Sequence, residues 1–293
     1  TLDSQTRRNL ELFQNGRWND PAISLFAILN LTTTPMGARL LREWIGQPLL
    51  NPESIHKRMD AVSWFCAKFH RVKNVRNKLR LIADLERIVG RIEARKISPR
   101  ELIALSQSLE ALPNLLQEFN ESDGVIELNQ LISQKVIWGE CDEVALLLRA
   151  SLKDEPGQVG EGNVIKEGYS PELDNLREAS RNAKGYIARL EEKERGLTNI
   201  RNLKVGYNRV FGYYIEVTRS NLSQVPEEYQ RRQSLTGSER FVTQELKEFE
   251  ELVLNAKEHL EELEHKLYYQ LCEQIGDRRK ALLEAAAIVA HID

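Results

Sequence analysis

Seven basic residues, six of them arginines, are concentrated between residues 198 and 243. Because this segment has only four glutamates, its net charge is +3, whereas the 293-residue chain carries −3. The planar fork of arginine matches phosphate oxygens, and turn amides and hydroxyls also contact nucleic-acid backbones. The segment therefore predicts a local phosphate-binding surface. Its candidate residues are Arg209, Arg219, Arg231, Arg232, Thr236, Gly237, Ser238 and Arg240.

These charges also have a more ordinary explanation. Exposed strand residues and edge-protecting charges are common in sheets, and some of these arginines could tie neighbouring strands together. On charge alone this explanation is the more frequent one, but the position of the segment between two long helices favours binding. A second basic stretch, Lys68 to Arg80, is interpreted as the solvated face of a helix, because Val72, Val75 and Leu79 alternate with its charges at near-helical spacing.

No catalytic or metal-binding constellation is present in the sequence. A phosphate-binding Gly-x-x-x-x-Gly-Lys-Ser/Thr loop, His-Glu-x-x-His, Gly-x-Ser-x-Gly and a calcium-binding loop are all missing. Cys66 and His70 could share a helix face, but a metal site needs more ligands. The glycines of residues 154–163 stand among acidic residues and predict a loop, followed by a possible strand at Val164–Glu167. We therefore expect no enzyme activity, catalytic residue, cofactor or metal in this 293-residue chain.

The remaining global features predict a cytoplasmic protein without a membrane span. The longest apolar run, Ala285–Ala290, is far shorter than a bilayer requires, and no secretory leader is recognisable. Three widely spaced cysteines fit a reducing compartment. The chain begins without methionine and stops within an Ala-rich helical pattern, which indicates a piece of a longer protein.

The fold is predicted to be mainly α. Straight-chain helix formers dominate and aromatic residues make up only 7%. Pro at the first helical position marks helix starts after Asp20, Thr34, Asn51 and Ser98, and each helix is expected to bury one apolar face.

Two long helices are predicted around the basic segment. The first starts at Ser170-Pro171 and the second after Thr243, and both repeat apolar residues at alternating spacings of three and four. Such helices should pair as antiparallel coiled-coil arms. Their predicted seams are Leu173, Leu176, Ser180, Ala183, Ile187, Leu190, Glu194 and Leu197 in the first, and Leu246, Phe249, Val253, Ala256, Leu260, Leu263, Leu267 and Gln270 in the second.

Between the arms, β-branched and aromatic residues predict a small antiparallel sheet, with a hairpin connection at Asn208–Gly212. The expected architecture is a helical bundle with two coiled-coil arms that carry this β-rich part at their tip. The predicted parts are a helical body (1–170), a first arm (171–197), the β-rich part (198–243), and a second arm that returns to the body (244–293).

Ordered strings along nearly the whole chain carry a family resemblance. They include Thr34–Leu41, Leu203–Asn208, Phe211–Val217, Arg231–Gln233 and Glu239–Thr243. In these strings the chain resembles the lever and clamp regions of the MutS DNA mismatch repair ATPases.

The resemblance implies a fragment of a DNA repair protein in which the helices form a lever and the sheet a clamp across double-stranded DNA. The full-length protein would bind ATP and magnesium in a C-terminal domain, read mismatches through an N-terminal Phe-x-Glu motif, form a homodimer and recruit a MutL-type partner. The two Phe-x-Glu strings here, Phe119–Glu121 and Phe249–Glu251, lie in helical patterns and receive no such role.

The resemblance also bears on the phosphate contacts. Many family members place Lys-Asn where this chain has Thr236-Gly237, so the implied contacts are Thr236, Ser238 and the Gly237 amide, with the arginines in support. Two alternatives remain open: a structural module that docks a partner protein, and a MutS-related recombination factor.

Overall fold

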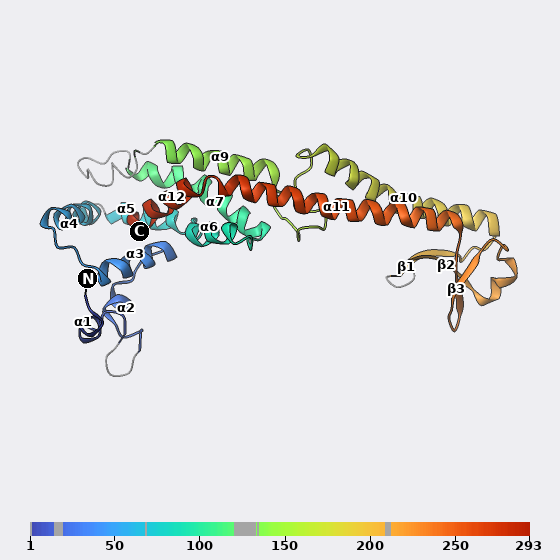
Figure 1. Ribbon diagram of the computed structural model, residues 1–293, viewed down its shortest axis with the longest axis horizontal. Helices are drawn as coiled ribbons and strands as arrows, with labels where there is room; N and C mark the ends of the chain where they lie inside the picture. The colour runs from blue at the N-terminus through green and yellow to red at the C-terminus, as the bar shows by residue number, and fades with distance from the viewer. Residues whose placement is uncertain (1, 15–19, 68, 120–132, 134, 209–211) are drawn as a thin grey trace. The chain divides into compact units, whose positions relative to one another are not determined.

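The computed structural model describes residues 2–14, 20–67, 69–119, 133, 135–208 and 212–293 (Figure 1). Helices predominate and one four-stranded antiparallel sheet is present, which confirms the predicted mainly α class. The chain divides into two compact units. Unit 1 comprises Thr1–Pro156 and Tyr269–Asp293, and unit 2 comprises Gly157–Tyr268.

Unit 1 is a bundle of helices. The C-terminal helix α12 contacts α3, α6 and α9, while α7 contacts α5, α6 and α9. Leucines such as Leu85, Leu102 and Leu148 are fully buried among them. The helices are α1 (Ser4–Asn9), α2 (Leu25–Leu29), α3 (Pro35–Gly46), α4 (Pro52–Ala67), α5 (Phe69–Leu79), α6 (Leu85–Glu93), α7 (Pro99–Leu116), η1 (Gln117–Phe119), α9 (Lys135–Ser151) and α12 (Arg279–Ile292).

Three of the four predicted helix starts are confirmed. Helices α3, α4 and α7 begin at their prolines, and Ser98 forms a capping box with Glu101. The start after Asp20 is wrong, because Ser24 supplies the cap and α2 begins only at Leu25. The expected buried face is also wrong for α4, which has no buried residue and exposes Met59 and Val62.

Two long helices, α10 (Pro171–Thr198) and α11 (Gln244–Gly276), lie antiparallel in unit 2 (Figure 1). Only the first 25 residues of α11 belong to this unit, which ends at Tyr268. The Tyr186 ring stacks on Phe249 with centroids 4.3 Å apart, and Lys193 pairs with Glu245 at 2.7 Å. The long helix pair is thus formed, but the seam is wrong at Leu197, which is 68% exposed. The reason is that the chain turns at Asn199, in the left-handed region with φ +59°, and sends the next apolar side chains into the core instead.

The sheet has the strand order β1-β2-β4-β3. Ile215, Val217 and Phe241 are buried in a core shared with Leu190 of α10 and Leu246 of α11, which fixes the sheet to both helices. The predicted hairpin is confirmed by the antiparallel pairing of β1 with β2, although its connection, residues 209–211, lies outside the described residues. The elements are β1 (Lys204–Asn208), β2 (Gly212–Thr218), η2 (Arg219–Gln224), β3 (Gln230–Ser234) and β4 (Ser238–Val242).

The predicted strand at Val164–Glu167 is wrong. Ile165 forms only an isolated bridge, and the segment from Gly157 to α10 is a loop of turns. The backbone N–H groups of Val164 and Ile165 both donate to the Glu264 carboxylate, so they are not available to a strand partner. None of the described helices combines the length and the apolar character that a membrane crossing requires.

Candidate nucleic-acid interface

The two faces of the sheet differ in chemistry. Along β2, Ile215 and Val217 point into the core, so the alternating residues Tyr214 and Glu216 belong to the opposite face. Arg240 lies directly across from Glu216 on β4 and therefore shares this polar face. The period of the strands thus places Arg240 on the face of the sheet opposite the apolar core.

Arg240 is engaged in binding the strands together. Its Nε donates to Glu216 Oε2 at 3.0 Å and its Nη1 to Gln233 Oε1 at 3.0 Å, and its guanidinium lies 4.0 Å from the centre of the Tyr214 ring. Ser238, also predicted as a contact, is buried and donates its hydroxyl to Glu216 Oε1 at 3.2 Å. These interactions link β2, β3 and β4.

Arg231 and Arg219 are partly engaged but remain exposed. Arg231 pairs with Glu239 at 2.8 Å, while its side chain is 61% accessible. Arg219 donates from Nη2 to the Leu235 carbonyl at 3.0 Å, and its backbone N–H donates to the Gly237 carbonyl at 3.2 Å. Arg219 is thereby held beside the turn between β3 and β4.

That turn presents the most accessible candidates. Leu235 N–H donates to the Ser238 carbonyl at 2.9 Å, which leaves Thr236 and Gly237 exposed at the tip. Open space surrounds the position that a Gly237 Cβ would take. Arg232, on the same hairpin, is exposed, and its side chain forms no hydrogen bond or ion pair with another described residue.

Five of the eight candidates therefore form an accessible basic group on and beside the β3–β4 hairpin. They are Arg219, Arg231, Arg232, Thr236 and Gly237. Arg240 and Ser238 support the sheet behind this group, and Arg209 lies outside the described residues. The group offers cations, a hydroxyl and backbone amides, which are suited to holding phosphates without reading bases.

Sequence reasoning missed the residues that hold the sheet on α10. Glu191 accepts from the Val205 N–H at 2.9 Å, and Arg195 donates to the Leu203 carbonyl at 2.7 Å, so an i,i+4 ion pair covers the edge of β1. Nearby, the buried Tyr229 hydroxyl donates to Glu194 at 2.5 Å. Burial and this carboxylate raise the pKa of Tyr229. Only the i,i+4 spacing of Glu191 and Arg195 was visible in the sequence.

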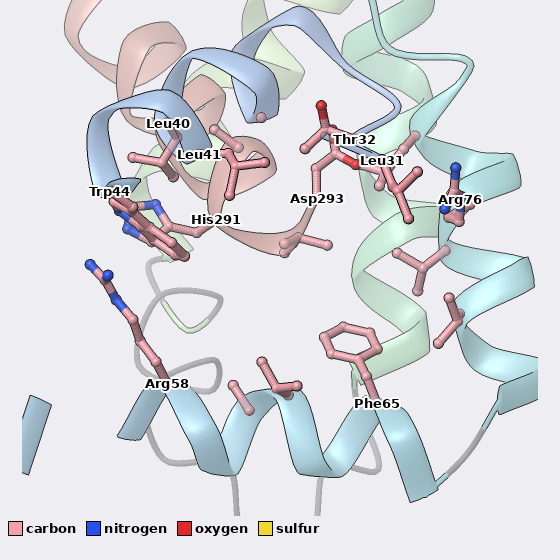
Figure 2. A pocket seen from close by; sticks show the side chains of 18 of the residues that line it. Leu31, Thr32, Leu40, Leu41, Trp44, Arg58, Phe65, Arg76, His291 and Asp293 are labelled. Carbon is pink, nitrogen blue, oxygen red and sulfur yellow. The ribbon is translucent and has the colours of Figure 1, made fainter. Parts of the chain in front are cut away.

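Unit 1 contains a cavity of about 560 Å³ with different chemistry (Figure 2). Phe65 of α4 and the Leu40 and Leu41 side chains of α3 line it, and the Arg58 guanidinium lies 3.6 Å from the centre of the Trp44 ring. Such an apolar lining suits an apolar group better than a phosphate.

The basic stretch beside this cavity is less solvated than predicted. Arg71 of α5 is buried with its guanidinium 4.8 Å from the Trp64 ring centre, and Arg76 lines the cavity. Lys78 pairs with Glu118 at 2.5 Å. From Phe69 to Leu79 the stretch is helical as predicted, but packing against neighbouring helices covers part of its charged face. In the described part of the chain, no three His, Cys, Asp or Glu residues are grouped to hold a metal ion.

Comparison with known proteins decides the family. The model of MutS domain III matches residues 5–293. The chain belongs to the MutS family. It is 42% identical to the DNA mismatch repair protein MutS of Thermotoga sp. (strain RQ2), 41% to that of Methanothrix thermoacetophila and 42% to that of Dehalococcoides mccartyi. Each comparison covers 100% of this chain but only 34–35% of the relative.

The chain therefore spans about a third of the length of its MutS relatives and corresponds to their domain III. The resemblance seen in the sequence is confirmed at the level of the family. Within this MutS domain, the basic β3–β4 hairpin of unit 2 has the chemistry of a nucleic-acid contact, and the cavity of unit 1 does not.

Proposed function

We propose that this chain is the lever and clamp part of a DNA mismatch repair protein, in which the sheet of unit 2 holds double-stranded DNA by its phosphates. The observation that carries the proposal is the exposed Arg232 beside the Thr236–Gly237 turn, on a basic sheet within a chain of net negative charge. Phosphate contacts position a protein on DNA without selecting a sequence. The clamp accordingly binds matched and mismatched duplexes alike.

The lever role follows from the way the sheet is attached. The core that includes Leu190, Phe241 and Leu246 joins the sheet to α10 and α11. A movement of these helices would move the sheet with them, so the coiled-coil arms would transmit a nucleotide-dependent change to the clamp. In this proposal ATP, magnesium and the catalytic groups belong to other parts of a full-length cytoplasmic homodimer, which also recruits a MutL-type partner.

The test is a fluorescence anisotropy titration of the 293-residue chain onto matched and mismatched duplexes at two salt concentrations. We expect weak binding that ignores the mismatch and decreases steeply with salt, because each phosphate contact releases counterions. Arg232→Glu should weaken binding roughly tenfold and lower the salt slope by about one.

Arg80→Glu is the matched control, since it makes the same charge change at an exposed position of unit 1. Equal losses in both variants would show a general charge effect and would contradict a contact at Arg232. Absence of binding even at low salt would favour the rival role, a module that docks a partner protein. Discrimination of the mismatch by this chain would place mismatch reading in the segment, against the proposal.

A further inference from the structure

The loop before α10 surrounds a buried carboxylate. Glu264 of α11 is fully buried, and its Oε2 accepts from the backbone N–H groups of Gly160 at 3.0 Å and Gly162 at 2.7 Å. Its Oε1 accepts from Val164 N–H at 2.9 Å and Ile165 N–H at 3.4 Å. Successive amides of this kind form the concave anion sites known from phosphate-binding loops. Here the anion is a side chain of the protein itself.

An arginine from the other helix completes the site. Arg177 of α10, which is 6% exposed, approaches Glu264 Oε1 at 3.5 Å. It also donates to the Gly162 carbonyl at 2.9 Å and to the Ile165 carbonyl at 2.6 Å. The buried carboxylate is therefore compensated by one cation and four amides. Loop, α10 and α11 meet at this single charge.

The glycines explain how the loop reaches the carboxylate. Gly160 and Gly162 have φ angles of +95° and +74°, which side chains rarely allow. A Cβ on Gly160 would lie 2.8 Å from the His265 ring, and a Cβ on Gly162 would lie 2.6 Å from a Leu260 methyl group. Both positions therefore favour glycine for their conformation, and a larger residue would also displace the His265 or Leu260 side chain.

We propose that Glu264 is a positioning residue, an internal anion that organises residues 157–168 and fixes α10 against α11. The proposal extends the lever role, because the same two helices carry the sheet. The loop contacts both α10 and α11 through its hydrogen bonds to Arg177 and Glu264, although it contains no regular strand.

The test is chemical rescue of Glu264→Ala. This change removes an acetate-shaped group and leaves the four amides and Arg177 without their anion. We expect the melting temperature to fall by about 10 °C, the loss typical of breaking a buried charge pair. Sodium acetate should then recover about a third of the loss in a saturable manner, because a ligand that binds only the folded state stabilises it.

Acetamide is the neutral control, and the unsubstituted chain with acetate is the second. Recovery by acetate alone and only in the variant supports the proposal. Equal recovery by acetamide, or a folded variant that does not respond to acetate, overturns it. Failure of the chain to bind DNA would count against the proposed function and not against this inference, since thermal rescue needs no DNA.

Hydrogen exchange of the unsubstituted chain keeps the proposal testable if Glu264→Ala does not fold. The Gly160 and Gly162 amides should exchange as slowly as those of buried helices, although they lie in a loop. The Gly168 amide donates at 2.7 Å to the more accessible Asp174 and should exchange faster. Equally fast exchange at all three glycines would overturn the proposal.

Discussion

Arginine and carboxylate side chains meet in two settings within unit 2. Arg177 and Glu264 are both buried, and backbone groups of the loop satisfy their remaining hydrogen bonds. Arg231 pairs with Glu239, whose carboxylate is also buried, but this arginine stays largely accessible to water. The difference shows that burial decides what a charge can do: the first arginine is committed to the fold, while the second can still exchange its partner for a phosphate.

Replacing each arginine by a neutral residue should give the largest difference in the free energy of unfolding between the two settings. Arg177→Met should destabilise the chain by about 3 kcal/mol or more, because it leaves a buried carboxylate without its cation. Arg231→Met should cost less than Arg177→Met, because Arg231 is largely exposed and water can take its place beside Glu239. Urea unfolding followed by circular dichroism measures both.

Equal losses for the two variants would show that burial does not control the contribution of these pairs. The salt dependence provides a second check. The stability difference between the unsubstituted chain and Arg231→Met should shrink as salt rises, whereas the difference for Arg177→Met should persist, because buried charges are little screened.

What the sequence predicted correctly was local. The helix starts after Thr34, Ser98 and Ser170 depend on residues a few positions away, and each is confirmed. The hairpin of β1 and β2 depends on a short turn and is also confirmed. Ile215 and Val217 belong to the β-branched residues that predicted the sheet, and both lie in its core.

What the sequence could not predict depends on distant partners. The Val164 amide meets Glu264, 100 positions away in the chain, and this bond replaces the predicted strand. Glu264 follows Leu263 of the predicted seam, and no residue near it in the sequence indicates that its carboxylate is buried. In the candidate site, residue type alone identified the arginines. Only the structure distinguishes Arg240, which is bound to Glu216, from Arg232, which is exposed.

A cation added to the accessible turn should strengthen DNA binding. Thr236 is exposed, so Thr236→Lys places an ammonium beside Arg219 and Arg232 without disturbing a buried group. We expect roughly threefold to tenfold tighter binding and a salt slope steeper by about 0.9, the value for one further phosphate contact. Anisotropy titrations over a series of salt concentrations give both quantities.

Gln107→Lys is the control for this gain, since it adds the same charge at an exposed position of α7 in unit 1. An equal gain in the control would mean that net charge alone is responsible. No change in the slope for Thr236→Lys would remove the turn from the predicted phosphate contacts, while the exposed Arg232 would remain to be tested on its own.

The smallest effect is expected from the accessible carboxylate between α10 and α11. Glu245 accepts from Lys193 at 2.7 Å and from the Tyr186 hydroxyl at 2.7 Å. These hydrogen bonds, that of Lys193 first, hold the pKa of Glu245 below its ordinary value. A carboxyl whose pKa is lowered by folding stabilises the protein above its ordinary pKa, and this contribution is lost as the pH falls through the lowered pKa.

The melting temperature of Glu245→Gln should therefore be lower than that of the unsubstituted chain at pH 7. The gap should close as the pH falls through the lowered pKa of Glu245, where its carboxyl becomes protonated. Thermal scans between pH 7 and pH 3 measure the gap, and Glu258→Gln, on the exposed surface of α11, should show none. A gap that stays constant down to pH 3 would mean that packing, not the charge of Glu245, sets the contribution. It would then place this carboxylate with Glu264 among the residues committed to the fold, despite its exposure.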